Sequence, residues 1–202
     1  MRAFEVELKA RLKQPAQVEA TAARLGTFVE AVVKEDIYFR PVGDANPVPA
    51  KRYRLRREKG QATVTFKQKI EANRVEVNDE VEFGVDDARA FFRFVHFLGF
   101  EPFVYKHKRC RVYRLGRANV ELNNVKHVGH FIEIEILCQA EADIPLARLE
   151  ISQILTKLGL NESDLEPQRY IALIQAAHPV TYRYLPGDNS EWPFAEEDLK
   201  HL

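Results

Sequence analysis

Apolar and charged residues alternate near the start of the chain, in the stretch FEVELKARL from Phe4 to Leu12. This period of two predicts a β-strand with one buried face, because successive side chains of a strand point to opposite sides. The other face carries two acids followed by two bases: Glu5, Glu7, Lys9 and Arg11. Whether these charges meet water or a ligand depends on how the rest of the chain folds.

The same kind of pattern recurs and predicts about eight strands in all. They cover 2–12, 27–40, a hairpin within 51–69 that turns near Gly60, 75–85, 100–115, 119–125 and 130–138. A period of 3.6 residues, with caps and glycine stops, predicts helices at 15–26, 86–99, 144–160 and 166–177. Residues 41–50 predict a loop, and the segment from Pro179 onward has turn residues and little periodicity.

An open sheet of this width would curl, so we predict an α+β fold built on a closed eight-stranded antiparallel β-barrel. If the charged strand faces point outward, the apolar faces fill the barrel. If they point inward, the barrel is a polar tunnel and helices must cover its apolar outside. The amphipathic helices favour the second arrangement. We therefore predict a tunnel domain at 1–178 with helices packed on its outside, followed by a C-terminal extension at 179–202.

The composition fits a globular protein with a real core, since 46% of the 202 residues are hydrophobic and 30% are charged. The net charge is zero, so only local charge patterns can indicate a partner. The two cysteines, Cys110 and Cys138, form neither a disulfide framework nor a zinc motif. With no apolar leader and no run of about 20 apolar residues, we expect a cytoplasmic protein that does not bind a membrane.

Two Glu-x-Glu pairs are candidate metal ligands: Glu5 with Glu7, and Glu133 with Glu135. Alternate residues share one face of a strand, about 7 Å apart, and carboxylate oxygens suit Mg²⁺ or Mn²⁺. For the first pair alone, a solvated strand face is the alternative interpretation. The second pair alternates with strongly apolar residues, so the acids lie on one face of the strand and a buried apolar face lies on the other. Four facing carboxylates would repel one another without a cation.

Basic residues occur in pairs on three of the predicted strands. Arginine binds phosphate oxygens in a bidentate manner and lysine acts as a point charge, so a cluster of this size fits a triphosphate. Cross-strand salt bridges to the glutamates are the alternative. A nucleic acid is not expected, because a basic stripe would not alternate with carboxylate strands. The pairs are Arg54 and Arg56, Lys67 and Lys69, and Lys106 and Lys108.

The later motifs follow the first E-x-E-x-K in a definite order: RLR, TFK, EVE, KHKR and then LNNVKHVGHFIEIE. Together they resemble the CYTH superfamily, the triphosphate tunnel metalloenzymes, whose pattern in the last motif is L-D-x-V-x-x-L-G-x-F-x-E-x-E. The segment LGLNESDLEPQRYIALI is similar to the closing helices of the class IV adenylate cyclase branch. The resemblance covers about residues 2–175.

This resemblance implies Mg²⁺- or Mn²⁺-dependent chemistry on a nucleotide or inorganic triphosphate, and it leaves a homodimer open. The implied catalytic residues are Glu5, Glu7, Lys9, Glu133 and Glu135. The implied metal ligands are Glu5, Glu7, Asn123, Glu133 and Glu135. The implied substrate-binding residues are Lys9, Arg54, Arg56, Lys67, Glu80, Glu82, Lys106, Lys108 and Arg109. Two positions depart from the family pattern: Asn123 replaces an aspartate, and Lys106-His107-Lys108 supplies lysine in place of the arginine of K-x-R.

We expect an adenylate cyclase of the class IV type, which converts ATP to cyclic AMP and pyrophosphate. The alternative is a hydrolase of tripolyphosphate, a nucleoside triphosphate or thiamine triphosphate, because the same motifs would hold the triphosphate in both reactions. A third interpretation is a non-catalytic module that binds polyphosphate or a nucleotide, as the two departures from the family pattern suggest.

Overall fold

The computed structural model describes residues 4–49, 52–72 and 76–178, apart from the side chains of 67–72, 76–80 and 89. The predicted extension at 179–202 lies outside these residues. The strands are β1 (Phe4–Arg11), β2 (Thr27–Pro41), β3 (Tyr53–Glu58), β4 (Gln61–Ala72), β5 (Glu76–Val85), β6 (Phe100–Leu115), β7 (Ala118–Val125) and β8 (Gly129–Cys138). The helices are α1 (Pro15–Leu25), α2 (Ala88–Phe97), α3 (Ile144–Lys157) and α4 (Tyr170–Ala177), with short 3₁₀ turns at Glu141–Asp143 and Glu162–Asp164.

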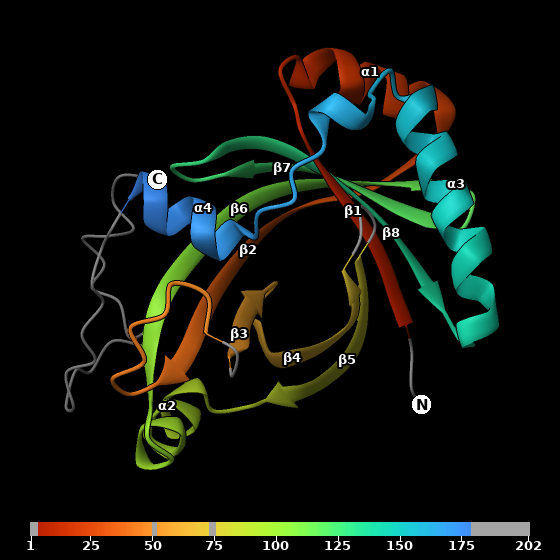
Figure 1. Ribbon diagram of the computed structural model, residues 1–202. Coiled ribbons are helices and arrows are strands. Elements are labelled where there is room, and N and C mark those ends of the chain that lie inside the picture. The colour runs from red at the N-terminus through yellow and green to blue at the C-terminus, as the bar shows by residue number, and fades with distance from the viewer. Residues whose placement is uncertain (1–3, 50–51, 73–75, 179–202) are drawn as a thin grey trace.

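All eight strands pair in the antiparallel sense, in the order β1-β5-β4-β3-β2-β6-β7-β8. Because β1 pairs with both β5 and β8, this order closes into a barrel. Figure 1 shows β3, β4 and β5 curving below β2 and β6. The predicted α+β fold with eight antiparallel strands is confirmed.

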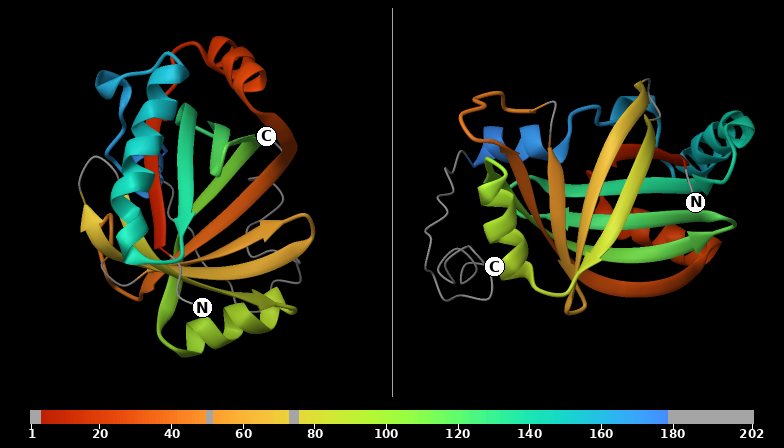
Figure 2. Two further views of the ribbon diagram at one scale, coloured as in Figure 1. Left: turned by 90° about the vertical axis from the view of Figure 1, so that its right-hand side faces the viewer. Right: turned by 90° about the horizontal axis from the view of Figure 1, so that it is seen from below.

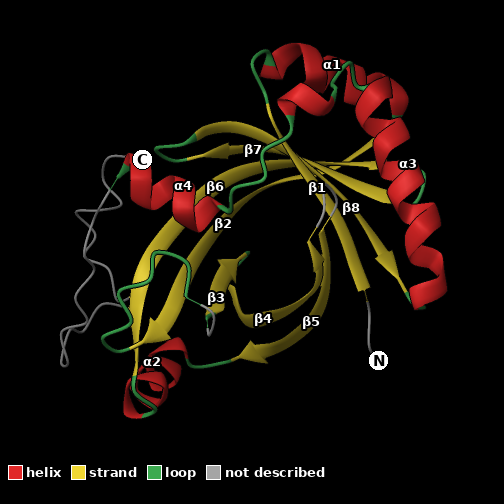
Figure 3. Cartoon of the chain, in the orientation of Figure 1, coloured by secondary structure: helices red, strands yellow, loops and turns green. Residues whose placement is uncertain are grey.

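Helices α1, α2 and α3 lie outside the strands, where they cover apolar strand faces (Figure 3). Helix α4 instead packs against Val104 and Phe131, which lie on the inward faces of β6 and β8. Helices α1 and α3 pack on β1, β7 and β8 in a core that includes Leu8, Ile134 and Ile151. Helix α2 packs on the opposite side, where Phe92 meets Phe39 of β2 (Figure 2). This burial of the outer faces leaves the alternate, charged positions of the same strands to point inward. None of the helices in the described ranges combines the length and apolar content that a membrane span requires.

The segment before α4 differs from the prediction, which placed a helix at 166–177. The helix begins only at Tyr170, so the prediction is wrong for residues 166–169. Here the backbone follows β1: Leu165 forms a bridge with Ala10, and the Glu166 N–H donates to the Lys9 carbonyl at 2.9 Å. Pro167 adds a local reason, since the residue before a proline avoids the helical region.

Candidate functional site

A cavity of about 810 Å³ lies inside the barrel and is lined by residues of all eight strands, of the 162–169 segment and of α4. Basic and acidic side chains are equally numerous among the described lining residues. The basic ones are Lys9, Lys34, Arg52, Arg54, Arg56, Lys106, Lys108 and Arg169. The acidic ones are Glu5, Glu7, Glu82, Glu121, Glu133, Glu135, Glu162 and Glu166. Beyond Lys34 and Lys108, the inner faces of β2 and β6 continue into a buried cluster of Val32, Cys110 and Val112.

The structure brings most of the sequence-predicted site residues to this cavity: Glu5, Glu7, Lys9, Arg54, Arg56, Glu82, Lys106, Lys108, Glu133 and Glu135. Two others lie elsewhere. Asn123 is buried behind Glu133, and Arg109 is exposed on the outer face of β6 because it alternates with Lys108. Lys67 and Glu80 occupy directly paired positions of β4 and β5, but their side chains lie outside the described part of the chain.

One group of interacting residues, the Asp36 cluster, comprises Asp36, Tyr38, Arg54, Arg56 and Lys106. Asp36 is fully buried, and its carboxylate accepts hydrogen bonds from Arg56 Nε at 2.7 Å and Arg56 Nη2 at 3.1 Å. Lys106 Nζ lies 2.7 Å from Asp36 Oδ2 and donates to the Tyr38 hydroxyl at 3.2 Å. Arg54 Nη1 lies 3.8 Å from the same carboxylate. Three cations therefore share one carboxylate.

Burial alone would raise the pKa of Asp36, since a buried carboxylate loses its hydration. The charges of Arg56, Lys106 and Arg54 outweigh this effect and hold the pKa of Asp36 well below its ordinary value. Asp36 is therefore ionised at neutral pH, and the cluster retains a net positive charge.

A second group, the Lys108 cluster, comprises Lys34, Lys108, Glu121, Asn123 and Glu133. Lys108 Nζ lies 2.8 Å from Glu121 Oε2 and 2.8 Å from Glu133 Oε2. Lys34 Nζ donates to Glu121 Oε1 at 2.6 Å, and Asn123 Nδ2 donates to Glu133 Oε2 at 2.7 Å. Two lysines are thus matched by two glutamates.

The pKa values in the Lys108 cluster reflect this matching. Burial raises the pKa of Glu133, but the Lys108 ammonium outweighs it and holds that pKa at about 2. The pKa of Glu121 is also held well below its ordinary value by Lys108 and Lys34, against the effect of burial. The expectation of four mutually repelling glutamates is therefore wrong for Glu133, which binds a lysine and an amide.

The remaining predicted metal ligands form a third group, the acidic trio of Glu5, Glu7 and Glu135. Glu7 and Glu135 occupy directly paired positions of β1 and β8, and Glu5 lies two residues further along the same face of β1. Among the described residues, no three acidic, histidine or cysteine side chains converge closely enough to hold a metal ion. The donor set nevertheless fits Mg²⁺ or Mn²⁺, because hard cations select carboxylate oxygens and the register places Glu7 beside Glu135.

The segment before α4 and the first turn of α4 form one wall of the cavity beside Lys9. Lys9 Nζ donates to the Gln168 carbonyl and lies 4.4 Å from the centre of the Tyr170 ring. Lys106 Nζ lies 5.0 Å from the same ring. Such ammonium–aromatic contacts are attractive because the ring face is electronegative. The ring of Tyr170 therefore links lysines from two different strands.

Sequence reasoning missed several residues of the site. Lys34, Asp36 and Tyr38 alternate on the inner face of β2, and the stretch KEDIYF carried this signal in its period of two. Arg169, by contrast, lies in an irregular segment, where no periodicity assigns a side chain to a face.

Comparison with known proteins places this site in context. The CYTH domain family matches residues 3–170. The adenylate cyclase CyaB of Aeromonas hydrophila is 25% identical over 187 residues, which cover 91% of this chain and 95% of that protein.

Solved structures agree with this match. A conserved hypothetical protein of Pyrococcus furiosus is 30% identical, with a TM-score of 0.73 and coverage of 84% of this chain and 99% of that one. A Hippeastrum protein described as an adenylyl cyclase candidate with a dominant triphosphatase activity is similar in fold. Its identity is 18%, its TM-score is 0.58, and the match covers 85% of this chain and 95% of that one.

Proposed function

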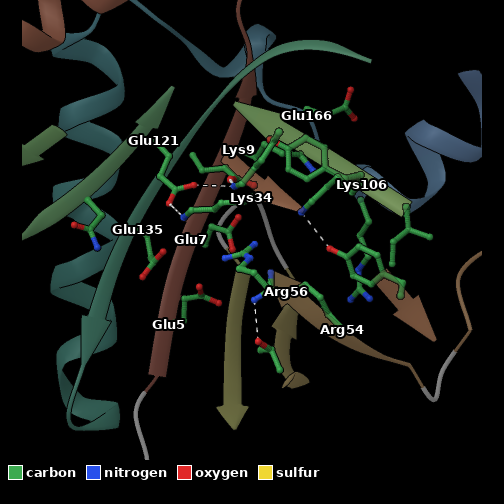
Figure 4. Close-up of a pocket in the computed structure, with 18 of the residues that line it drawn as sticks. Glu5, Glu7, Lys9, Lys34, Arg54, Arg56, Lys106, Glu121, Glu135 and Glu166 are labelled. Carbon is green, nitrogen blue, oxygen red and sulfur yellow. Dashed lines mark hydrogen bonds and ion pairs between the residues drawn. The ribbon is translucent and has the colours of Figure 1, made fainter. Parts of the chain in front are cut away.

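Because the chain belongs to the CYTH family, we propose that it is a metal-dependent enzyme that acts on a triphosphate, with the cyclisation of ATP as its reaction. The observation that carries this proposal is the separation of charge across the cavity. In Figure 4, Glu5 and Glu135 lie on one side of the cavity and Arg54 and Lys106 on the other.

The three groups of residues differ in their net charge. The Asp36 cluster has three cations, which face the Asp36 carboxylate and, 3.7 Å from Arg54, that of Glu82, so it keeps an excess of positive charge. The acidic trio is made of carboxylates. The Lys108 cluster is balanced. A triphosphate with a divalent cation also carries both signs of charge, with the negative oxygens bridged to the positive ion. It therefore matches a cavity that has a positive end and a negative end.

We assign the phosphate oxygens to Arg54, Arg56 and Lys106, with Lys9 beside them. Arginine offers several N–H donors in a planar fork, which suits phosphate. Glu7 and Glu135, with Glu5, would hold the divalent cation. When bound, that cation would acidify an attacking oxygen and neutralise phosphate charge.

In the cyclase reaction, the 3′-hydroxyl of ATP attacks the α-phosphorus and the bond from this phosphorus to the bridging α–β oxygen breaks. Pyrophosphate leaves with the bond's electron pair. The fixed cations of Arg54, Arg56 and Lys106 would stabilise the charge that develops on it, without any rearrangement of solvent. The hydroxyl proton passes to water or to a carboxylate of the cavity.

The second candidate is hydrolysis of the triphosphate, with water in place of the ribose hydroxyl. The similarity to the Hippeastrum protein, described as having a dominant triphosphatase activity, favours it. The same phosphate-binding residues would serve, since both reactions are nucleophilic displacements at a phosphorus of a bound triphosphate. The two candidates differ only in the nucleophile and in which phosphorus it attacks.

A substrate panel tests both candidates. The protein is incubated with ATP, tripolyphosphate or thiamine triphosphate and with Mg²⁺ or Mn²⁺, and cyclic AMP, pyrophosphate and inorganic phosphate are measured. A cyclase is expected to give cyclic AMP and pyrophosphate in equal amounts from ATP alone. Inorganic phosphate without cyclic AMP would support the hydrolase instead. Binding without turnover under either metal would indicate a non-catalytic module.

A further inference from the structure

We infer that Asp36 is a positioning residue of the phosphate site, which holds Arg54, Arg56 and Lys106 in the arrangement that a triphosphate requires. This inference rests on the proposed function. It adds that a carboxylate, Asp36, forms part of the proposed phosphate site. Asp36 itself does not line the cavity, so it acts on the substrate only through the cations in front of it.

The strand register explains why this position can organise the others. On β2, Asp36 is directly opposite Arg56 of β3 on one side and Lys106 of β6 on the other. Arg54 lies two residues before Arg56 on the same face of β3. One carboxylate at the centre of three strands therefore contacts every cation of the positive end.

The bonds to Asp36 also fix how these cations can meet a ligand. Arg56 donates to both carboxylate oxygens, through Nε and Nη2. A guanidinium has five N–H groups in a rigid plane, so these two bonds set the orientation of the remaining donors. Lys106 is held between Asp36 Oδ2 at 2.7 Å and the Tyr38 hydroxyl at 3.2 Å, which fixes its ammonium beside the ring of Tyr170. Without Asp36, the three like charges would repel one another, and Arg56 would lose both of the bonds that orient its guanidinium.

Positioning and simple charge predict opposite effects of the same substitution. Asp36→Asn removes a negative charge near a site for a polyanion, so Coulomb attraction alone predicts tighter binding. If Asp36 orders the cations, its loss leaves them disordered, and the ligand must order them when it binds. Binding then becomes weaker although the site has become more positive.

The chain offers a matched control on the same two strands. Glu35 and Arg57 are the next residue pair along β2 and β3, and their side chains point to the outer face. Arg57 Nε donates to Glu35 Oε2 at 2.8 Å. Glu35→Gln therefore also removes a carboxylate that binds an arginine of the neighbouring strand. This carboxylate lies outside the cavity.

The test is calorimetric binding of tripolyphosphate without divalent cations, together with thermal melting of each variant. We expect Asp36→Asn to bind at least ten-fold more weakly than the wild type, and Glu35→Gln to bind within two-fold of it. Asp36→Glu keeps the charge but moves it by one methylene, and we expect an intermediate affinity. Equal or tighter binding by Asp36→Asn would overturn the inference.

Folding and function are separated in the same experiment. If Asp36→Asn does not melt cooperatively, Asp36→Glu decides. Loss of folding in both variants would overturn the positioning role in favour of a purely structural one. Failure of the proposed function looks different, because then the wild type itself would not bind tripolyphosphate, or Arg56→Gln would bind it as well as the wild type does.

Discussion

Replacing Lys108 with methionine is expected to lower the free energy of unfolding by about 3–5 kcal/mol at neutral pH, because it removes the cation that the buried carboxylate of Glu133 contacts. Lys108 is buried and contacts both Glu121 and Glu133 at 2.8 Å. Methionine has a similar length but supplies no charge. Chemical denaturation of the wild type and the variant measures the difference. The matched control is Lys13→Met, since Lys13 pairs with Asp164 in solvent and such a pair contributes less than about 1 kcal/mol.

The loss of unfolding free energy in Lys108→Met is also expected to depend on pH. In the wild type, Glu133 has a pKa of about 2 against an ordinary value of 4.5, so its contribution is present above pH 4.5 and is lost as the pH falls toward 2. In Lys108→Met, burial is no longer offset by the Lys108 ammonium, so the pKa of Glu133 rises. The variant therefore gains stability as the pH falls from 7 toward 4.5. The difference in unfolding free energy between the wild type and the variant becomes smaller. If the difference in unfolding free energy stayed constant from pH 7 to pH 3, the ionic contacts of Lys108 would contribute little to stability.

Arg56→Gln is expected to reduce the affinity for a triphosphate by about 2–5 kcal/mol, which is roughly 30-fold or more. Arg56 is the cation that Asp36 holds with two bonds, and Arg56 lines the cavity. Glutamine keeps an amide donor but loses the charge and the planar fork. Titration with tripolyphosphate measures the affinity, and turnover of ATP measures the effect on the reaction.

The neighbouring arginine provides the control for this substitution. Arg57 lies on the same strand, points to the outer face and pairs with Glu35. Arg57→Gln removes the same charge from the same strand and should leave the affinity for tripolyphosphate within about two-fold, since the charge lies outside the cavity. Equal losses in the two variants would mean that only the total charge of the protein matters, and the proposed phosphate site would then be wrong.

Which residues share a strand face could be predicted from the local sequence alone. The period of two is a local property of an extended chain, so EVELK and FIEIE each assign their acids to one side without knowledge of any partner strand. The apolar residues between the acids then fix that side, because they must be buried under a helix. For this reason Glu5, Glu7, Arg54, Arg56 and Lys106 could all be predicted to face the interior.

Which of these residues contact one another depends on the fold of the whole chain. Pairing between strands that are far apart in the sequence depends on register, and a shift of one residue reverses every face. The register placed Lys108 against Glu121 and Glu133, which removed Glu133 from the expected set of repelling acids. It also placed Asp36 between β3 and β6 and left Arg109 outside. Electrostatic interactions act over a few ångströms in space, so the balance of charge in the cavity is set by contacts that the sequence order does not contain.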